Sequence, residues 1–112
     1  MIISTFNRSR YIVGLLRQLG TFYTRNYEVI VVNDGSVDDT KEQLGKANWS
    51  IPHLRIIHQS NRGRASARSA GAEASLTDKL IFFDDDVSLS PELIESHISK
   101  FDDYDIVQGL VF

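Results

Sequence analysis

The chain has 112 residues, of which 42% are hydrophobic and 24% are charged, and its formal net charge is -3. This composition is typical of a folded globular protein rather than a disordered one, and the acidic balance disfavours general nucleic-acid binding. Because there is no cysteine, neither a disulfide framework nor a thiolate metal site is available.

The apolar runs are short compared with a membrane-spanning helix, which needs ~20 such residues. Met1–Ile3 is typical of the end of a buried strand, so we expect the chain to begin inside its first strand. The polar segment Ser4–Arg8 follows at once, a pattern unlike a secretory signal. We therefore expect a cytoplasmic protein, or one associated with a membrane through parts outside this chain.

The first predicted helix starts near Asn7 or Ser9, because either side chain can act as an N-terminal cap. Gly20 is predicted to end this helix, since glycine commonly follows the last helical residue. Its apolar residues have the spacing of a helix face that packs on a core: Ile12, Leu15, Leu16 and Leu19.

A strand over residues 27–32 is predicted next, because β-branched residues dominate it, and a turn-forming segment, Asn33–Ser36, follows. Ser36 and Asp39 have the spacing of a capping box, which predicts that a short helix starts there and runs to about Lys46. A third strand is predicted over residues 54–57. An alanine-rich helix then covers residues 65 to about 75.

Residues 80–83 predict a fourth strand, buried on both faces, because four large apolar residues stand in a row. Ser90 and Pro91 are typical of a helix start, with Ile94, Ile98 and Phe101 as its apolar stripe, and residues 106–112 predict a fifth strand. The alternation of strands and helices implies a mostly parallel sheet with helices on both faces, in a single α/β domain over residues 1–112.

Three consecutive aspartates, Asp84, Asp85 and Asp86, follow the fourth strand. Neighbouring carboxylates repel one another, and a divalent cation shared with a substrate phosphate would remove this repulsion. The alternative is a solvated acidic turn. We favour the cation site, because open α/β sheets bind ligands at the carboxyl ends of their strands.

Polar clusters also follow the first two predicted strands, at Ser4-Thr5-Phe6-Asn7 and at Asn33–Ser36. In a parallel sheet these strand ends share one edge, so the clusters are expected to meet the aspartates in one crevice. Asp34 is placed to accept a hydrogen bond from a base N–H or a ribose hydroxyl. A turn aspartate bonded to its own backbone is the alternative.

Three arginines, Arg62, Arg64 and Arg68, open the alanine-rich helix, where the helix dipole does not favour cations. Their position indicates another use, such as binding an anionic phosphate, although a solvated basic face is the expected interpretation for at least one of them. Arg68 is the strongest phosphate candidate, because alanines enclose it on a helix that we expect to be buried.

Four of these segments, in this order, resemble the N-terminal half of family 2 glycosyltransferases, which have the GT-A fold. The segments are Ile3–Arg8, Val29–Ser36, Asn61–Gly71 and Phe83–Asp86, and the last is similar to the family's Asp-x-Asp metal motif. The resemblance implies inverting, metal-assisted transfer of a sugar from a nucleotide-diphosphate sugar, a UDP-sugar above all, to an acceptor hydroxyl, as in polysaccharide biosynthesis. A saccharide, lipid-linked or protein acceptor is left open.

The resemblance also implies roles for individual residues. Asp34 would hold the base and Asp84 would face the ribose, while Asp86 together with Asp84 would ligate Mn²⁺ or Mg²⁺ and Asp85 would be the spacer between them. The catalytic base is expected beyond Phe112, so that this chain would be the donor-binding half of a transferase. The implied donor-binding residues are Ser4, Thr5, Phe6, Asn7, Asp34, Arg68, Asp84 and Asp85.

Three positions depart from the family pattern: Ser4 replaces a proline, Asn33 an aspartate and Ser69 an asparagine. The alternative function is a non-catalytic nucleotide- or partner-binding module that retains the fold. A phosphotransferase with an aspartate nucleophile is disfavoured, since its first strand would end in Asp-x-Asp.

Overall fold

The structure is a computed structural model that describes residues 1–22, 28–46, 48–77, 79–99 and 106–108. Within this part of the chain, five parallel strands form one sheet in the order β3-β2-β1-β4-β5. The strands are β1 (Ile2–Thr5), β2 (Val29–Asp34), β3 (Leu54–Gln59), β4 (Leu80–Asp84) and β5 (Ile106–Gln108). The helices are α1 (Ser9–Phe22), α2 (Thr40–Lys46), α3 (Arg64–Ala74) and α4 (Pro91–Ser99).

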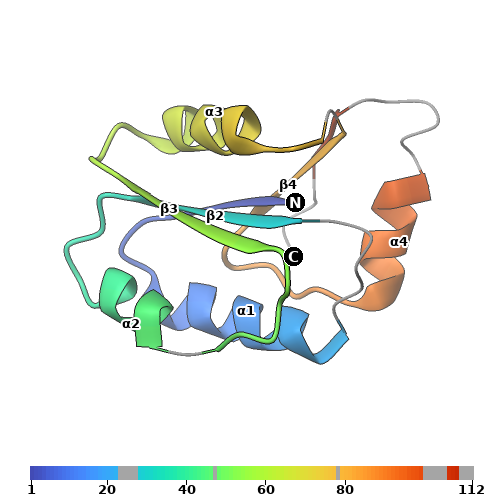
Figure 1. The fold of residues 1–112 in the computed structure, drawn as a ribbon, viewed down its shortest axis with the longest axis horizontal. Helices are drawn as coiled ribbons and strands as arrows, with labels where there is room; N and C mark the ends of the chain where they lie inside the picture. The colour runs from blue at the N-terminus through green and yellow to red at the C-terminus, as the bar shows by residue number, and fades with distance from the viewer. Residues whose placement is uncertain (23–27, 47, 78, 100–105, 109–112) are drawn as a thin grey trace.

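Helices cover both faces of the sheet, with α1 and α2 on one face and α3 on the other (Figure 1). Alternate residues of a strand point to opposite faces, so each central strand contributes to two cores. Ile3 and Val31 belong to the larger core with α1, whereas Ile2 and Val32 pack with Ala67 of α3. The predicted α/β architecture, a parallel sheet covered on both faces, is confirmed.

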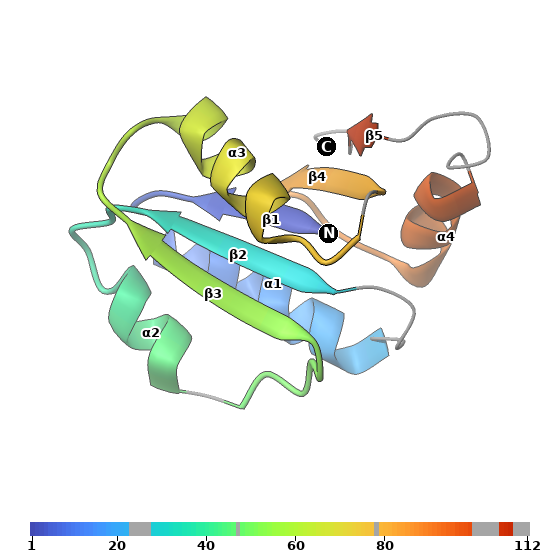
Figure 2. The same cartoon turned by 45° about the horizontal axis from the view of Figure 1, so that its top comes forward.

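The strand order reverses at β1, which lies between β2 and β4 (Figure 2). The chain first adds β2 and β3 on one side of β1 and then crosses over to add β4 on the other side. The backbone register pairs Ser4 with Asp84 and Thr5 with Asn33, so the ends of these three strands lie level. Ligands of open α/β sheets bind beyond the strand ends at such a reversal.

Helix α1 continues past Gly20, its predicted end, to Phe22. Gly20 instead lies where α1 meets the loop after α2, because a Cβ at this position would be 2.5 Å from the carbonyl oxygen of Trp49. Close packing, rather than helix termination, requires the glycine here. The predicted apolar face of α1 is confirmed, since its four residues are all buried: Ile12, Leu15, Leu16 and Leu19.

Helix α2 begins at Thr40 rather than at Ser36, and it ends at Lys46 as predicted. The hydroxyl of Ser36 is engaged within the turn itself, where it donates a hydrogen bond of 2.6 Å to Oδ1 of Asn33. Asp38 binds the first residue of the helix instead, accepting a 3.0 Å hydrogen bond from the backbone N–H of Thr40. The predicted capping box is therefore wrong.

Helix α4 starts as predicted, because the Ser90 hydroxyl accepts a 3.1 Å hydrogen bond from the backbone N–H of Leu93. Ile94 of its predicted stripe is buried, whereas the side chain of Ile98 and all of Phe101 lie outside the described residues. Residues 106–108 pair with β4, and residues 109–112 of the predicted strand also lie outside. No helix in the described ranges has the length and apolar character needed to cross a bilayer.

Gly71 in α3 faces β1 so closely that an added methyl group does not fit. A Cβ there would lie 2.5 Å from Cγ2 of Ile2, whereas nothing lies within 4 Å of a Cβ at Gly14 in α1. We expect Gly71→Ala to lower the free energy of unfolding by about 1–3 kcal/mol through overpacking, despite the better helix propensity of alanine. Urea unfolding measures this difference.

Gly14→Ala is the matched control, because it makes the same change in an open part of a helix. It is expected to raise the free energy of unfolding by up to about 1 kcal/mol. If Gly71→Ala were stabilising to the same extent, the close contact between α3 and β1 would be contradicted.

Candidate functional site

A cleft of about 260 Å³ opens at the carboxyl edge of the sheet. The carboxyl ends of β1, β2 and β4 line it, together with residues just after β1 and β4, the loop between β3 and α3, and the start of α3. Its lining residues are Ser4, Thr5, Phe6, Arg8, Asp34, Asn61, Gly63, Arg64, Ala67, Asp84 and Asp85. Six of the residues predicted for the site are thus in one place: Ser4, Thr5, Phe6, Asp34, Asp84 and Asp85.

Arg68 and Asp86 lie beside the cleft and contact residues of its lining. A guanidinium nitrogen of Arg68 is 3.5 Å from Oδ1 of Asp84, and Oδ2 of Asp86 is 3.3 Å from a guanidinium nitrogen of Arg8. These two predicted residues are therefore next to the cleft without lining it.

Asn7, the remaining predicted residue, joins the segment after β1 to the segment after β2. Its backbone N–H donates a 2.9 Å hydrogen bond to the Ser36 hydroxyl, and its side-chain Oδ1 accepts a 2.8 Å hydrogen bond from the N–H of Val37. Asn7 has a positive φ of 52°, which asparagine tolerates better than most residues. The contacts of Asn7 therefore position the edge of the site.

Asp34, at the end of β2, holds the segment that leads into α3. Its carboxylate accepts hydrogen bonds from Nε2 of Gln59 at 2.8 Å and from the backbone N–H groups of Arg62 and Gly63, both at 2.9 Å. These partners are distant in the sequence, so the alternative of a turn aspartate bonded to its own backbone does not hold. A carboxylate has about four acceptor positions, so these three hydrogen bonds leave about one of them unused.

Burial raises the pKa of Asp34, but the hydrogen bonds from Gln59, Arg62 and Gly63 together lower it by more than burial raises it. The pKa therefore lies below its ordinary value of 3.8. The folded state therefore favours the ionised carboxylate. The resulting stability is complete above the ordinary pKa and is lost as the pH falls through the lower folded-state pKa.

We expect Asp34→Asn to lower the free energy of unfolding at pH 7 by roughly 1–3 kcal/mol, because the amide NH₂ group faces backbone donors. The difference from the unmodified protein is expected to shrink as the pH falls from 3.8 toward the lower folded-state pKa, because the unfolded chain takes up a proton there before the folded aspartate does. Urea unfolding at pH 7, 4 and 3 measures it. Asp39→Asn removes the same charge from an exposed aspartate and is the control. A difference independent of pH would contradict this role.

Asp85 is the most buried of the three consecutive aspartates, with a side chain that is 7% exposed. It accepts a 2.8 Å hydrogen bond from the Thr5 hydroxyl and a 3.4 Å hydrogen bond from Arg8. Burial raises the pKa of Asp85 above its ordinary value, and the hydrogen bond from Thr5 and the charge of Arg8 oppose this rise only in part. Asp85 thus connects the end of β4 to the end of β1 and is more than a spacer.

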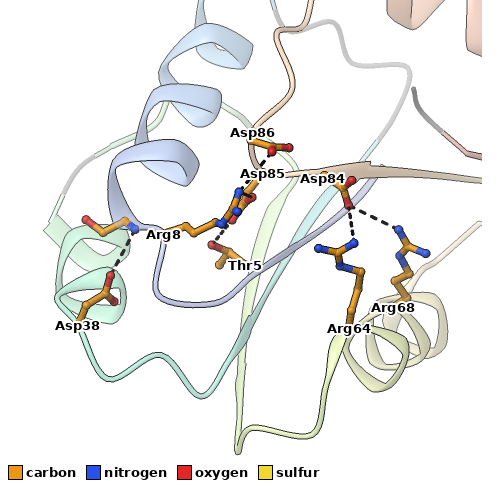
Figure 3. A network of polar contacts seen from close by, with 9 residues as sticks. Thr5, Arg8, Asp38, Arg64, Arg68, Asp84, Asp85 and Asp86 are labelled. Carbon is orange, nitrogen blue, oxygen red and sulfur yellow. Dashed lines mark hydrogen bonds and ion pairs between the residues drawn. The ribbon is translucent and has the colours of Figure 1, made fainter. Parts of the chain in front are cut away.

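The carboxylates of Asp84 and Asp86 point toward different arginines (Figure 3). Asp84, whose side chain is 16% exposed, faces Arg64 and Arg68 of α3 at 4.0 and 3.5 Å. Asp86, at 33% exposed, faces Arg8. Three arginines from two separate segments therefore balance the three aspartates.

Arg8 is a site residue that the sequence patterns did not single out. Its guanidinium contacts Asp85 and Asp86 and lies 5.2 Å from the centre of the Tyr11 ring. The sequence contains one signal for this role. Arg8 follows the first strand, and the acidic cluster comes at the end of the fourth strand, which pairs with the first. That signal is readable only once the strand order is known.

The carboxylate oxygens of Asp84 and Asp86 are donors of the kind that Mg²⁺ and Mn²⁺ prefer. Among the residues that the structure describes, no group of three or more histidine, aspartate or glutamate side chains is arranged to hold a metal ion. A cation at this position would therefore take its other ligands from phosphate oxygens and water. The donor chemistry fits a cation shared with a phosphate.

The chain matches a family described as Glycosyl transferase family 2 over residues 1–112. A Haemophilus influenzae protein named an uncharacterized glycosyltransferase is 35% identical over 96 residues, a match that covers 85% of this chain and 31% of the relative. The teichoic acid poly(glycerol phosphate) polymerase of Staphylococcus epidermidis is 31% identical over 107 residues, a match that covers 94% of this chain and 15% of that relative.

A crystal structure of S. aureus TarS in complex with UDP-GlcNAc superimposes with a TM-score of 0.76 at 25% identity, covering 90% of this chain and 30% of that chain. Similarity in sequence and in backbone therefore extends over most of these 112 residues. The chain spans about a quarter to a third of the length of the first curated relatives that it matches.

Proposed function

Because the chain belongs to glycosyl transferase family 2, we propose that it forms the donor-binding part of a glycosyltransferase with the GT-A fold. The reaction is the transfer of a sugar from a nucleotide-diphosphate sugar to an acceptor hydroxyl, with inversion at the sugar carbon. The observation that carries this proposal is the cleft, where acids that end β2 and β4 meet arginines from two other segments.

A uridine nucleotide is the proposed donor. Two of the S. aureus TarS structures that this chain resembles are complexes, one with UDP-GlcNAc and one with UDP, which supports a UDP-sugar here. The cleft offers the complementary chemistry, because its guanidinium groups suit phosphates and its carboxylates suit hydroxyl and N–H donors.

The lining residues divide the proposed donor among them. Asp34 uses its remaining acceptor position for the base, and Phe6, which is 43% exposed, provides an apolar surface in the same cleft. Ser4 and Thr5 line the cleft at the end of β1, and Asp84 faces the ribose. In this arrangement the chain binds and orients the nucleotide.

A divalent cation is part of the proposal, held by Asp86 and Asp84. When bound, it supplies Lewis-acid stabilisation of the charge that develops on the leaving nucleoside diphosphate. Asp85 remains in contact with Thr5 and Arg8 and thereby holds in place the backbone that carries Asp84 and Asp86.

Titration of the full chain with UDP in the presence of Mn²⁺ tests the proposal. We expect binding that is lost on chelation of the cation, and we expect Asp86→Ala to weaken it by about tenfold or more, because one carboxylate ligand of the cation is removed. Asp39→Ala, which removes an exposed aspartate of the α2 start, is expected to leave UDP binding unchanged.

Two outcomes would contradict parts of this proposal. UDP binding that is insensitive to chelation and to Asp86→Ala would remove the cation from the mechanism. Tight binding of UDP without binding of any UDP-sugar would favour a non-catalytic nucleotide-binding module.

A further inference from the structure

Arg64 is the first residue of α3, and it lines the cleft opposite Asp84. A guanidinium nitrogen of Arg64 lies 4.0 Å from Oδ1 of Asp84, and the Arg64 side chain is 66% exposed. Arg68, one helical turn later, lies 3.5 Å from the same oxygen and is 30% exposed. One carboxylate oxygen thus has two cationic partners, and Arg64 is the more distant and more exposed of the two.

The contact between Arg64 and Asp84 is weak for three physical reasons. Its 4.0 Å separation exceeds hydrogen-bond length. Exposed ion pairs contribute little net free energy, because water screens them and an ordered arginine loses rotamer freedom. The helix dipole also opposes a cation in the first turn. An anion that entered the cleft would therefore compete effectively for this guanidinium.

Arg68 is held more firmly than Arg64. Its guanidinium carbon lies 5.9 Å from the centre of the Phe82 ring, in addition to the contact with Asp84. Asp84 therefore keeps a positive partner when Arg64 moves away. The movement does not leave an unpaired carboxylate at the end of β4, which would be costly.

Resting on the donor site proposed above, we infer that Arg64 leaves Asp84 and binds a phosphate of the nucleoside diphosphate when the donor enters. Guanidinium groups match phosphate oxygens with two parallel hydrogen bonds, which the exposed contact with Asp84 lacks. The exchange preserves the local charge balance, because the phosphate pairs with Arg64 while Asp84 becomes available to the cation. Arg64 is therefore a further donor-binding residue.

This exchange predicts that loss of the Arg64 charge weakens the binding of UDP but not the binding of Mn²⁺ alone. Arg64→Gln is expected to raise the Kd for UDP in the presence of Mn²⁺ by about tenfold, through loss of one charge-assisted contact. The same variant is expected to bind Mn²⁺ alone at least as tightly as the unmodified chain, because a competing cation has been removed from Asp84. Arg64→Lys keeps the charge but not the forked geometry. Its Kd for UDP is expected to lie between those of the unmodified chain and of Arg64→Gln.

Isothermal titration of UDP and electron paramagnetic resonance titration of Mn²⁺, both on the full chain, provide the two readouts. Arg10→Gln is the matched control, because Arg10 is also an exposed arginine in the first turn of a helix and is not part of the cleft lining. Its Kd for UDP is expected to equal that of the unmodified chain.

The remaining outcomes are distinguishable. If the unmodified chain binds UDP and Arg64→Gln binds it equally well, the role of Arg64 is overturned and the donor site stands. If Arg64→Gln weakens UDP and Mn²⁺ binding together, Arg64 only supports the structure of the site and the exchange is overturned. If the unmodified chain does not bind UDP with Mn²⁺, the donor site and the role of Arg64 both fall.

Discussion

Charge balance at the end of β4 is the interaction on which the rest of this site depends. Three adjacent carboxylates repel one another, and one of them, Asp85, is buried, which adds a desolvation cost. Arg8 on one side and the arginines of α3 on the other compensate these charges. The buried contact between Asp85 and Thr5 joins β4 to β1, and Arg68, the more firmly held of the two α3 arginines, joins α3 to β4.

Asp34 joins the end of β2 to the loop before α3, just as Asp85 joins the end of β4 to the end of β1. It holds the backbone of residues 62 and 63, so that α3 starts at the cleft. Gly35 makes this approach possible, because a Cβ there would collide with the backbone nitrogen of Asn61 and its φ of 72° also favours glycine. One aspartate and one glycine at the end of β2 thereby position a helix nearly 30 residues later.

The charged groups of the site differ in how firmly they are held, and this difference suits a binding site. Asp85 is buried and hydrogen-bonded, so it belongs to the framework. Asp86 and Arg64 are partly or largely exposed, and exposed pairs separate at little cost. In the proposed function, ligand binding at this edge would be an exchange of partners among paired charges. These pairs compensate the carboxylates and the guanidinium groups in the structure without a ligand.

The sequence by itself determined the order of strands and helices, the parallel sheet and the meeting of Asp34 with the aspartates after β4. These features follow from local hydrophobic spacing and from the rule that parallel strands end at one edge. Only the tertiary structure decided that Gly20 packs against a distant loop, that Ser36 serves its turn rather than a helix cap, and that Arg8 balances the acids. Each of these three residues has a partner remote in the chain, since the Ser36 hydroxyl also accepts a hydrogen bond from the backbone N–H of Asn7. Such partners are set by the order of strands in the sheet and by packing, which no local pattern encodes.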